Sequence, residues 1–285
     1  MGAIDLLLNV AGLLLWISWR SQRFDPLVRS TPVTLVGTLK RAETKRLKGV
    51  NLALVLVSLV VLRAVLYWLL GAPANWTPKI NLELVVLAFR GDLFGPALLY
   101  SGLSFLRMLM VFYFWLLVVA MLNRNRPTAD PIDKLVRLHL GKPGRWPWPL
   151  QVLLPFLATV ALWMGLHPLL VRLGVVAPTH SMAHLAEQGL LVGLGLVLSL
   201  KYLLTAILLA HLVSSYIYLG TSPIWDFIAQ TAGGLTAPLH RLPLRLARVD
   251  LAPALGVVVI LCLLEWLPNF VLSRLAAAHL SAWPL

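Results

Sequence analysis

Charged residues and cysteine are both scarce in this sequence. Only 12% of its 285 residues are charged, whereas a soluble domain carries about 25%. The single cysteine, Cys262, excludes a disulfide within the chain and any zinc site built from several cysteines. The sequence also lacks a Ser-His-Asp, Cys-His or phosphate-loop pattern. We therefore expect a protein that is not an enzyme and that needs no cofactor.

Apolar residues make up 59% of the chain and the mean hydropathy is +0.84, which excludes a disordered protein. Crossing a bilayer takes roughly 20 mostly apolar residues. We expect spans at residues 3–19, 52–70, 97–122, 150–173, 189–219 and 251–271. The first is expected to be retained, because its basic residues Arg20 and Arg23 follow the apolar run, whereas those of a signal peptide precede it. The sequence thus predicts an all-α membrane protein with six transmembrane helices.

The net charge of +13 is concentrated in three loops between these spans. Residues 20–48 hold eight Lys and Arg, residues 123–149 hold six, and residues 220–250 hold three. Cytoplasmic loops of membrane proteins are enriched in these residues. We therefore expect the three loops on the cytoplasmic side of the inner (cytoplasmic) membrane and both termini outside. The basic face is expected to meet anionic lipid headgroups and no nucleic acid.

Each basic loop contains a polar residue followed by proline and then an amphipathic stretch. The three pairs are Asp25-Pro26, Asp130-Pro131 and Ser222-Pro223. Asp and Ser favour the N-cap of a helix and Pro its first position. This pattern predicts three hairpins, at residues 1–72, 97–174 and 189–273, each with a short amphipathic helix at the cytoplasmic interface.

The second amphipathic stretch shows the expected division of faces most clearly. Its apolar side is expected to carry Ile132, Leu135, Val136 and Leu138, and its polar side Asp133, Lys134 and Arg137.

Ionisable residues inside the spans are candidate functional groups, because their burial in a bilayer is costly. They are Arg63, Arg107, Lys201, His211 and Glu265. We expect Glu265 to pair with Lys201 or Arg107. Any remaining cation would then face a water-filled cavity, an anionic lipid, a haem propionate or an ion path. The alternative is that Arg63 reaches outward and that Lys201 neutralises Glu265 for packing alone.

A group of polar residues near the fifth span is a candidate metal site. His180, His184 and Glu187 have the spacing of one helical face, and two His with a carboxylate can hold a transition metal. The alternative is an ordinary helix start with Thr179 as its N-cap, and this interpretation, without a metal, is the one we expect. Gly189, Gly193 and Gly195 favour close packing of the fifth span on another helix.

Residues 195–270 resemble the YggT family of small bacterial membrane proteins, which also has chloroplast relatives. The resemblance depends on Pro223, Thr231, Pro238, Arg241, Pro243, Asp250 and Pro253. In place of the paired arginines usual in the family, this chain has His240 and Arg241. The second hairpin resembles the family unit in outline, and the first less. Asp250 is expected to cap the last span, with Pro253 in its first turn.

The resemblance implies a non-enzymatic integral membrane protein. The family is associated with osmotic or ion homeostasis, with loci near cell-division genes and, in plastids, with maturation of a haem-bearing cytochrome. We expect a scaffold or assembly factor that contacts lipids and other membrane proteins through helix packing and its basic cytoplasmic face. The alternative is a subunit of an ion channel or transporter.

Overall fold

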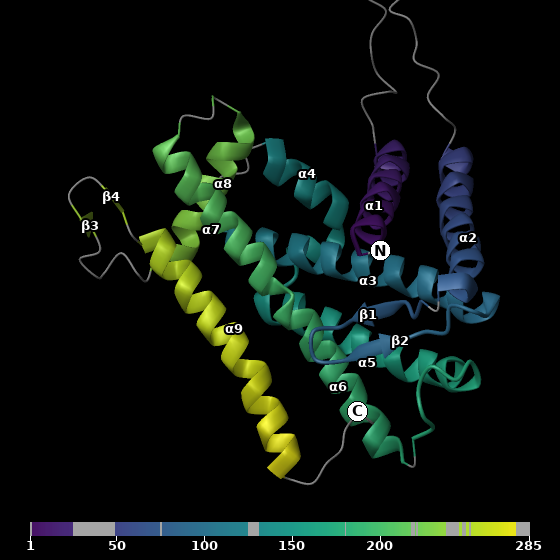
Figure 1. Cartoon of the computed structure of the whole chain (residues 1–285). Helices are drawn as coiled ribbons and strands as arrows, with labels where there is room; N and C mark the ends of the chain where they lie inside the picture. Colours follow the sequence, from purple (N-terminus) through teal and green to yellow (C-terminus); the bar gives the residue numbers. More distant parts are fainter. Residues whose placement is uncertain are drawn as a thin grey trace, which may run out of the picture. The chain divides into compact units, whose positions relative to one another are not determined.

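The computed structural model of the chain describes residues 2–24, 49–74, 76–124, 131–179, 181–217, 220, 222–237, 245–246, 249–250 and 252–277 (Figure 1). These residues form two compact units. Unit 1 comprises Met1–Pro78 and Phe89–Leu109, and unit 2 comprises Lys79–Ala88 and Met110–Leu285.

Among the described residues, six helical segments are long and apolar enough to cross a membrane, so the protein is a helical, multi-pass membrane protein. They are Gly2–Ser21, Asn51–Gly71, Phe94–Leu122, Trp148–Arg172, Met182–Tyr216 and Pro253–Val271. The prediction of six spans is confirmed as far as length and composition decide it. The three-hairpin arrangement, the interfacial position of the amphipathic helices and the orientation stay predictions.

Unit 1 contains α1 (Gly2–Phe24), α2 (Gly49–Ala74) and the first part of α3 (Phe94–Leu122). Helices α1 and α2 pack against each other. A glycine permits the close approach of α1 to α3, because a Cβ at Gly12 would lie 2.8 Å from the Phe105 ring. Near the end of α2, the rings of Tyr67 and Trp76 lie 4.8 Å apart.

Unit 2 contains the rest of α3 and most of the remaining helices. These are α4 (Pro131–Leu140), the short 3-10 helix η2 (Lys142–Arg145), α5 (Trp148–Arg172), α6 (Met182–Leu198), α7 (Leu200–Tyr216), α8 (Pro223–Thr236) and α9 (Ala252–Ala277). Helix α5 packs along α6, and α7 packs against α8 and α9. A Cβ at Gly193 would lie 2.9 Å from the Phe156 ring. The predicted close packing at this glycine is confirmed.

The fifth span differs from the single helix over residues 189–219 that the sequence predicts. It starts earlier, at Met182, and is divided into α6 and α7 at Ser199. The interruption is a single tight turn. Ser199 keeps helical dihedrals (φ −60°, ψ −17°), its N–H bonds to both the Gly195 and the Leu196 carbonyl, and the N–H of Tyr202 bonds to the Ser199 carbonyl, each at 3.2 Å. The 35 residues of Met182–Tyr216 extend about 52 Å at 1.5 Å per residue. That exceeds a hydrocarbon core of about 30 Å, so this segment is tilted or bent, or projects beyond the core.

The part of the chain that the structure describes also forms two short antiparallel ribbons, which lie outside the all-α expectation. Strand β1 (Lys79–Asn81) pairs with β2 (Val86–Ala88), with Ile80 opposite Leu87. Strand β3 (Arg245–Leu246) pairs with β4 (Val249–Asp250). Strands of two or three residues show too little alternation for the sequence to reveal them.

The β4 strand corrects the role expected of Asp250. This residue is opposite Arg245 in the ribbon, and α9 begins two residues later, at Ala252. The ribbon therefore takes Asp250 away from the N-cap position. Pro253 does lie in the first turn of α9, as the sequence predicts.

Candidate functional site

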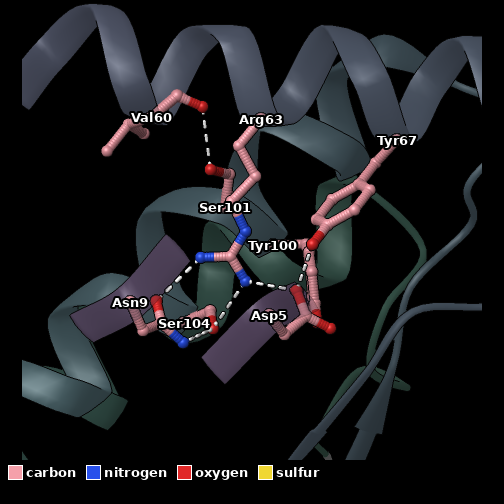
Figure 2. Close-up of polar contacts among 8 residues, drawn as sticks. All are labelled: Asp5, Asn9, Val60, Arg63, Tyr67, Tyr100, Ser101 and Ser104. Carbon is pink, nitrogen blue, oxygen red and sulfur yellow. Dashed lines mark hydrogen bonds and ion pairs between the residues drawn. The ribbon is translucent and has the colours of Figure 1, made fainter. Parts of the chain in front are cut away.

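A charged residue is buried at the centre of unit 1. Arg63 lies on α2 with only 1% of its side chain exposed, and one of its guanidinium nitrogens, Nη2, lies 2.7 Å from Asp5 Oδ1 on α1. Figure 2 shows the Arg63 side chain reaching towards α1 between Asp5 and Asn9. Because the bilayer offers no water to solvate such a group, an arginine here requires polar partners within the protein.

Helix α1 supplies two of these partners from adjacent turns. Asp5 and Asn9 are four residues apart, so both face α2 and α3. Arg63 Nη1 donates to Asn9 Oδ1 at 2.8 Å, and Asn9 Nδ2 donates to Ser104 Oγ on α3 at 3.1 Å. Arg63 Nη2 also donates to Ser104 Oγ, at 3.0 Å. The guanidinium thus connects all three helices of unit 1.

Two tyrosines complete the surroundings of the carboxylate (Figure 2). The Tyr67 hydroxyl donates to Asp5 Oδ1, and the Tyr100 hydroxyl donates to Asp5 Oδ2 at 2.9 Å. The Arg63 guanidinium carbon also lies 5.4 Å from the Tyr67 ring centroid and 5.3 Å from that of Tyr100, within the range of cation–π attraction. Asp5 therefore accepts hydrogen bonds on both oxygens.

The Arg63 network, which we define as Asp5, Asn9, Arg63, Tyr67, Tyr100 and Ser104, is neutral in total charge. Arg63 Nε is its one buried nitrogen without a hydrogen-bond partner among the described residues. Only 6% of the α1 span is buried, and apolar surface gives no hydrophobic driving force for association in lipid. The polar contacts of this network therefore fix α1 in place.

Sequence reasoning found Arg63 but not its surroundings. The interpretation of Arg63 as a side chain reaching outward is wrong, because the side chain is buried and turned towards Asp5. The sequence feature that could have revealed these partners is the i, i+4 spacing of Asp5 and Asn9 in an otherwise apolar span. In a membrane helix this spacing indicates a polar face directed at a neighbouring helix.

Among the described residues, unit 2 also holds a partly buried ion pair. Lys201 Nζ on α7 lies 2.8 Å from Glu83 Oε2 at the tip of the β1–β2 hairpin, and the two side chains are 18% and 9% exposed. The contact partner of Lys201 is thus Glu83 and not Glu265, which corrects the expected pairing. Glu265 on α9 acts on Lys201 through a weaker electrostatic interaction. Arg107, on the part of α3 in unit 1, has interactions of its own.

Among the described residues, no group of three His, Cys, Asp or Glu side chains is placed to hold a metal ion. His180 lies outside the described residues. His184 Nδ1 lies 3.4 Å from Glu187 Oε2, and its other ring nitrogen lies 3.4 Å from Gln188 Nε2. The N-cap of α6 is Ser181, whose hydroxyl accepts the His184 N–H at 3.2 Å, so the prediction of Thr179 as N-cap is wrong.

The residues that carry the family resemblance are only partly described. Pro238, Arg241 and Pro243 lie outside the described residues. Pro223 begins α8, as the Ser-Pro pair predicts. Thr231 is buried on α8, where its hydroxyl accepts from Nδ2 of Asn123, the residue that follows α3, at 3.0 Å and donates to the Phe227 carbonyl at 2.8 Å. Thr231 therefore fixes α8 to the end of α3.

Helix α4 divides its faces differently from the sequence expectation. Val136 and Leu140 pack against α3, but Leu135 and Leu138 are exposed. Asp133, expected on the polar side, is buried and forms an ion pair of 2.8 Å with Arg137. The expectation failed because it grouped all four apolar residues on one side, whereas α3 covers a narrower stripe.

Comparison with known proteins adds no relative: no family model, curated protein or solved structure matches this chain.

Proposed function

We propose that the protein is a non-enzymatic membrane scaffold or assembly factor of the YggT type. The observation that carries this proposal is that Arg63 and Lys201, two cations inside the spans, each have an acidic partner. Each forms an ion pair within its own unit, with Asp5 and Glu83 respectively. Because such pairs neutralise charge and hold elements together, these two contacts serve assembly of the fold as it stands in this structure and leave the outer helix faces for other contacts.

Two spans offer apolar surface for such contacts. Only 6% of the α1 span and 6% of the α9 span are buried, and Leu14 on α1 and Leu263 on α9 are each 59% exposed. We propose that lipids and other membrane proteins cover these faces. The protein would lie in the inner (cytoplasmic) membrane with both termini outside. Its basic loops, with α4 and α8 at the interface, would contact anionic headgroups on the cytoplasmic side.

Site-specific photo-crosslinking in native membranes tests the scaffold proposal. A photo-reactive amino acid is placed at Leu14 or at Leu263, with Leu208 on α7, which is 1% exposed, as the buried control. We expect the two exposed positions to crosslink to a defined set of membrane proteins and the control position to crosslink only within the chain. Crosslinks to lipid and to copies of the chain alone, at both exposed positions, would contradict an assembly factor.

A subunit of an ion channel or transporter is the second candidate function. The tight turn at Ser199 favours it, because irregular helical turns inside spans often mark hinges or binding sites. Purified protein in liposomes should then conduct K⁺ or Cl⁻, and Lys201→Gln should change that flux. Absence of flux for both ions would argue against this candidate and leave the scaffold proposal untouched.

A further inference from the structure

The β1–β2 hairpin places non-helical backbone against the fifth span. Its residues Lys79–Ala88 belong to unit 2, whereas the flanking Pro78 and Phe89 belong to unit 1. Ile80 and Leu87 are both buried, and the N–H of Leu82 bonds to the Val85 carbonyl at 2.7 Å across the tip. The hairpin is therefore a defined element with a buried face.

The tip of the hairpin touches the backbone of α6. The carbonyl oxygen of Leu82 would lie 2.0 Å from a Cβ built on Gly195. No side chain fits at that distance, so the contact requires glycine at this position. Of the three glycines of α6 that the sequence singled out, Gly195 thus receives a loop and not a helix.

Beside this contact, Glu83 directs its carboxylate at Lys201. In addition to the 2.8 Å ion pair, the Tyr202 hydroxyl lies 3.4 Å from Glu83 Oε2, and Lys201 Nζ lies 5.1 Å from the centroid of the Tyr202 ring. Glu83 adopts a positive φ of 70°, which non-glycine residues rarely adopt and which is energetically unfavourable. Its N–H bonds to Asn81 Oδ1 at 2.8 Å, and this bond together with the ion pair offsets the cost.

Lys201 lies in the first turn of α7, directly after the tight turn at Ser199 and inside the apolar segment Met182–Tyr216. The backbone of the β1–β2 hairpin beside it is not helical. Such backbone at membrane depth is tolerated only where protein buries it or where it lines a water-filled cavity. If Glu83 left, the ammonium of Lys201 would keep a distant counter-charge in Glu265. Withdrawal of the hairpin would therefore leave the charge of Lys201 partly compensated.

We propose that Lys201 and Tyr202 form a carboxylate-binding site that the β1–β2 hairpin closes as a tethered plug. Glu83 occupies the site in this structure. The site holds the Glu83 carboxylate even though a second carboxylate, that of Glu265, acts on Lys201. A free carboxylate of the same charge can therefore take the place of Glu83 when the hairpin withdraws. The ligand class is a small carboxylate. The proposal goes beyond the scaffold function and does not depend on it.

The plug is tested by the reactivity of Lys201 towards a water-soluble amine reagent, measured by mass spectrometry on the full chain in liposomes made permeable to the reagent. Lys79, exposed on the same hairpin, is the internal reference. Glu83→Gln removes the charge, and Gly195→Ala adds the methyl group that collides with Leu82. We expect each to raise Lys201 labelling about tenfold relative to Lys79, equivalent to about 1.4 kcal/mol in the opening equilibrium.

The matched control is Asp92→Asn, which removes a carboxylate from the same inter-helix segment but from the exposed pair with Arg90. It should leave Lys201 labelling unchanged. Two results would overturn the plug. One is that Lys201 is already as reactive as Lys79 in the protein without substitutions. The other is that Lys201 stays protected in both variants while their helix content is normal.

The ligand class is tested in the Glu83→Gln variant with acetate, using neutral acetamide of similar shape as the control. Acetate should slow labelling of Lys201 without slowing that of Lys79, whereas acetamide should slow neither. An equal effect of acetate and acetamide on Lys201 would overturn the carboxylate site even where the variant opens the hairpin.

Discussion

Replacing Asp5 with Asn should destabilise unit 1 strongly, although the two side chains have nearly the same shape. The substitution removes the negative charge 2.7 Å from Arg63 Nη2 and one of the two oxygens that accept from Tyr67 and Tyr100. The guanidinium, with 1% of its side chain exposed, then has no counter-ion in the network. Removing one partner of a buried pair typically costs about 3–5 kcal/mol.

Each individual hydrogen bond of the network contributes less to the free energy of unfolding than the neutralisation of the Arg63 charge does. Asn9→Ala removes one bond to Arg63 and one to Ser104. Hydrogen bonds between membrane helices average about 0.6 kcal/mol each, so this variant should lose about 1 kcal/mol. The order of effects, Asp5→Asn well above Asn9→Ala, follows from charge neutralisation and not from the number of contacts.

The assay is unfolding of the purified protein by titration with SDS in mild detergent, followed by far-UV circular dichroism. Asp92→Asn serves as control, because its ion pair with Arg90 is exposed on both sides, at 65% and 46%, and should not affect stability measurably. If Asp5→Asn were no less stable than Asp92→Asn, the interpretation of the Arg63 network as the contact that fixes α1 would be refuted.

Three further predictions concern other contacts. Thr231→Val should lower the free energy of unfolding by about 1 kcal/mol, because it removes the bond to Asn123, and equal stability by SDS titration would contradict this role. Gly193→Leu should separate α5 from α6, which a fall in crosslinking between cysteines placed on the two helices would show. Arg90 lowers the pKa of Asp92 by hydrogen bonding, so Asp92 stays ionised to lower pH. Arg90→Gln should raise that pKa, as followed by carboxyl-carbon NMR, and an unchanged value would refute the link.

The spans could be predicted from the sequence because a long apolar run determines its own structure in a bilayer. Ser199 lies inside such a run, and nothing in its neighbours marks the tight turn, which depends on hydrogen bonds of the folded helix. The partner of Lys201 could not be found either. Glu83 is 118 residues away in the sequence, in a loop whose strands are too short to show alternation.

Only part of the Arg63 network could be predicted from the sequence. Its acidic and amide members are four residues apart on one helix, which predicts a polar face. Nothing local indicates which basic residue meets that face, because Arg63 and Arg107 both lie inside neighbouring spans. Tertiary packing decides the choice. The same holds for α4, where contact with α3 buries Asp133 and leaves Leu135 exposed.

Arg63 and Lys201, two cations inside the spans, are each neutralised by an acidic partner in their own unit. The most direct test is the stability of the double variant Asp5→Asn with Arg63→Gln, compared with both single variants in the same SDS titration. Because both charges leave together, the account predicts that the double variant is more stable than either single variant. A double variant whose loss equals the sum of the two single losses would contradict the claim.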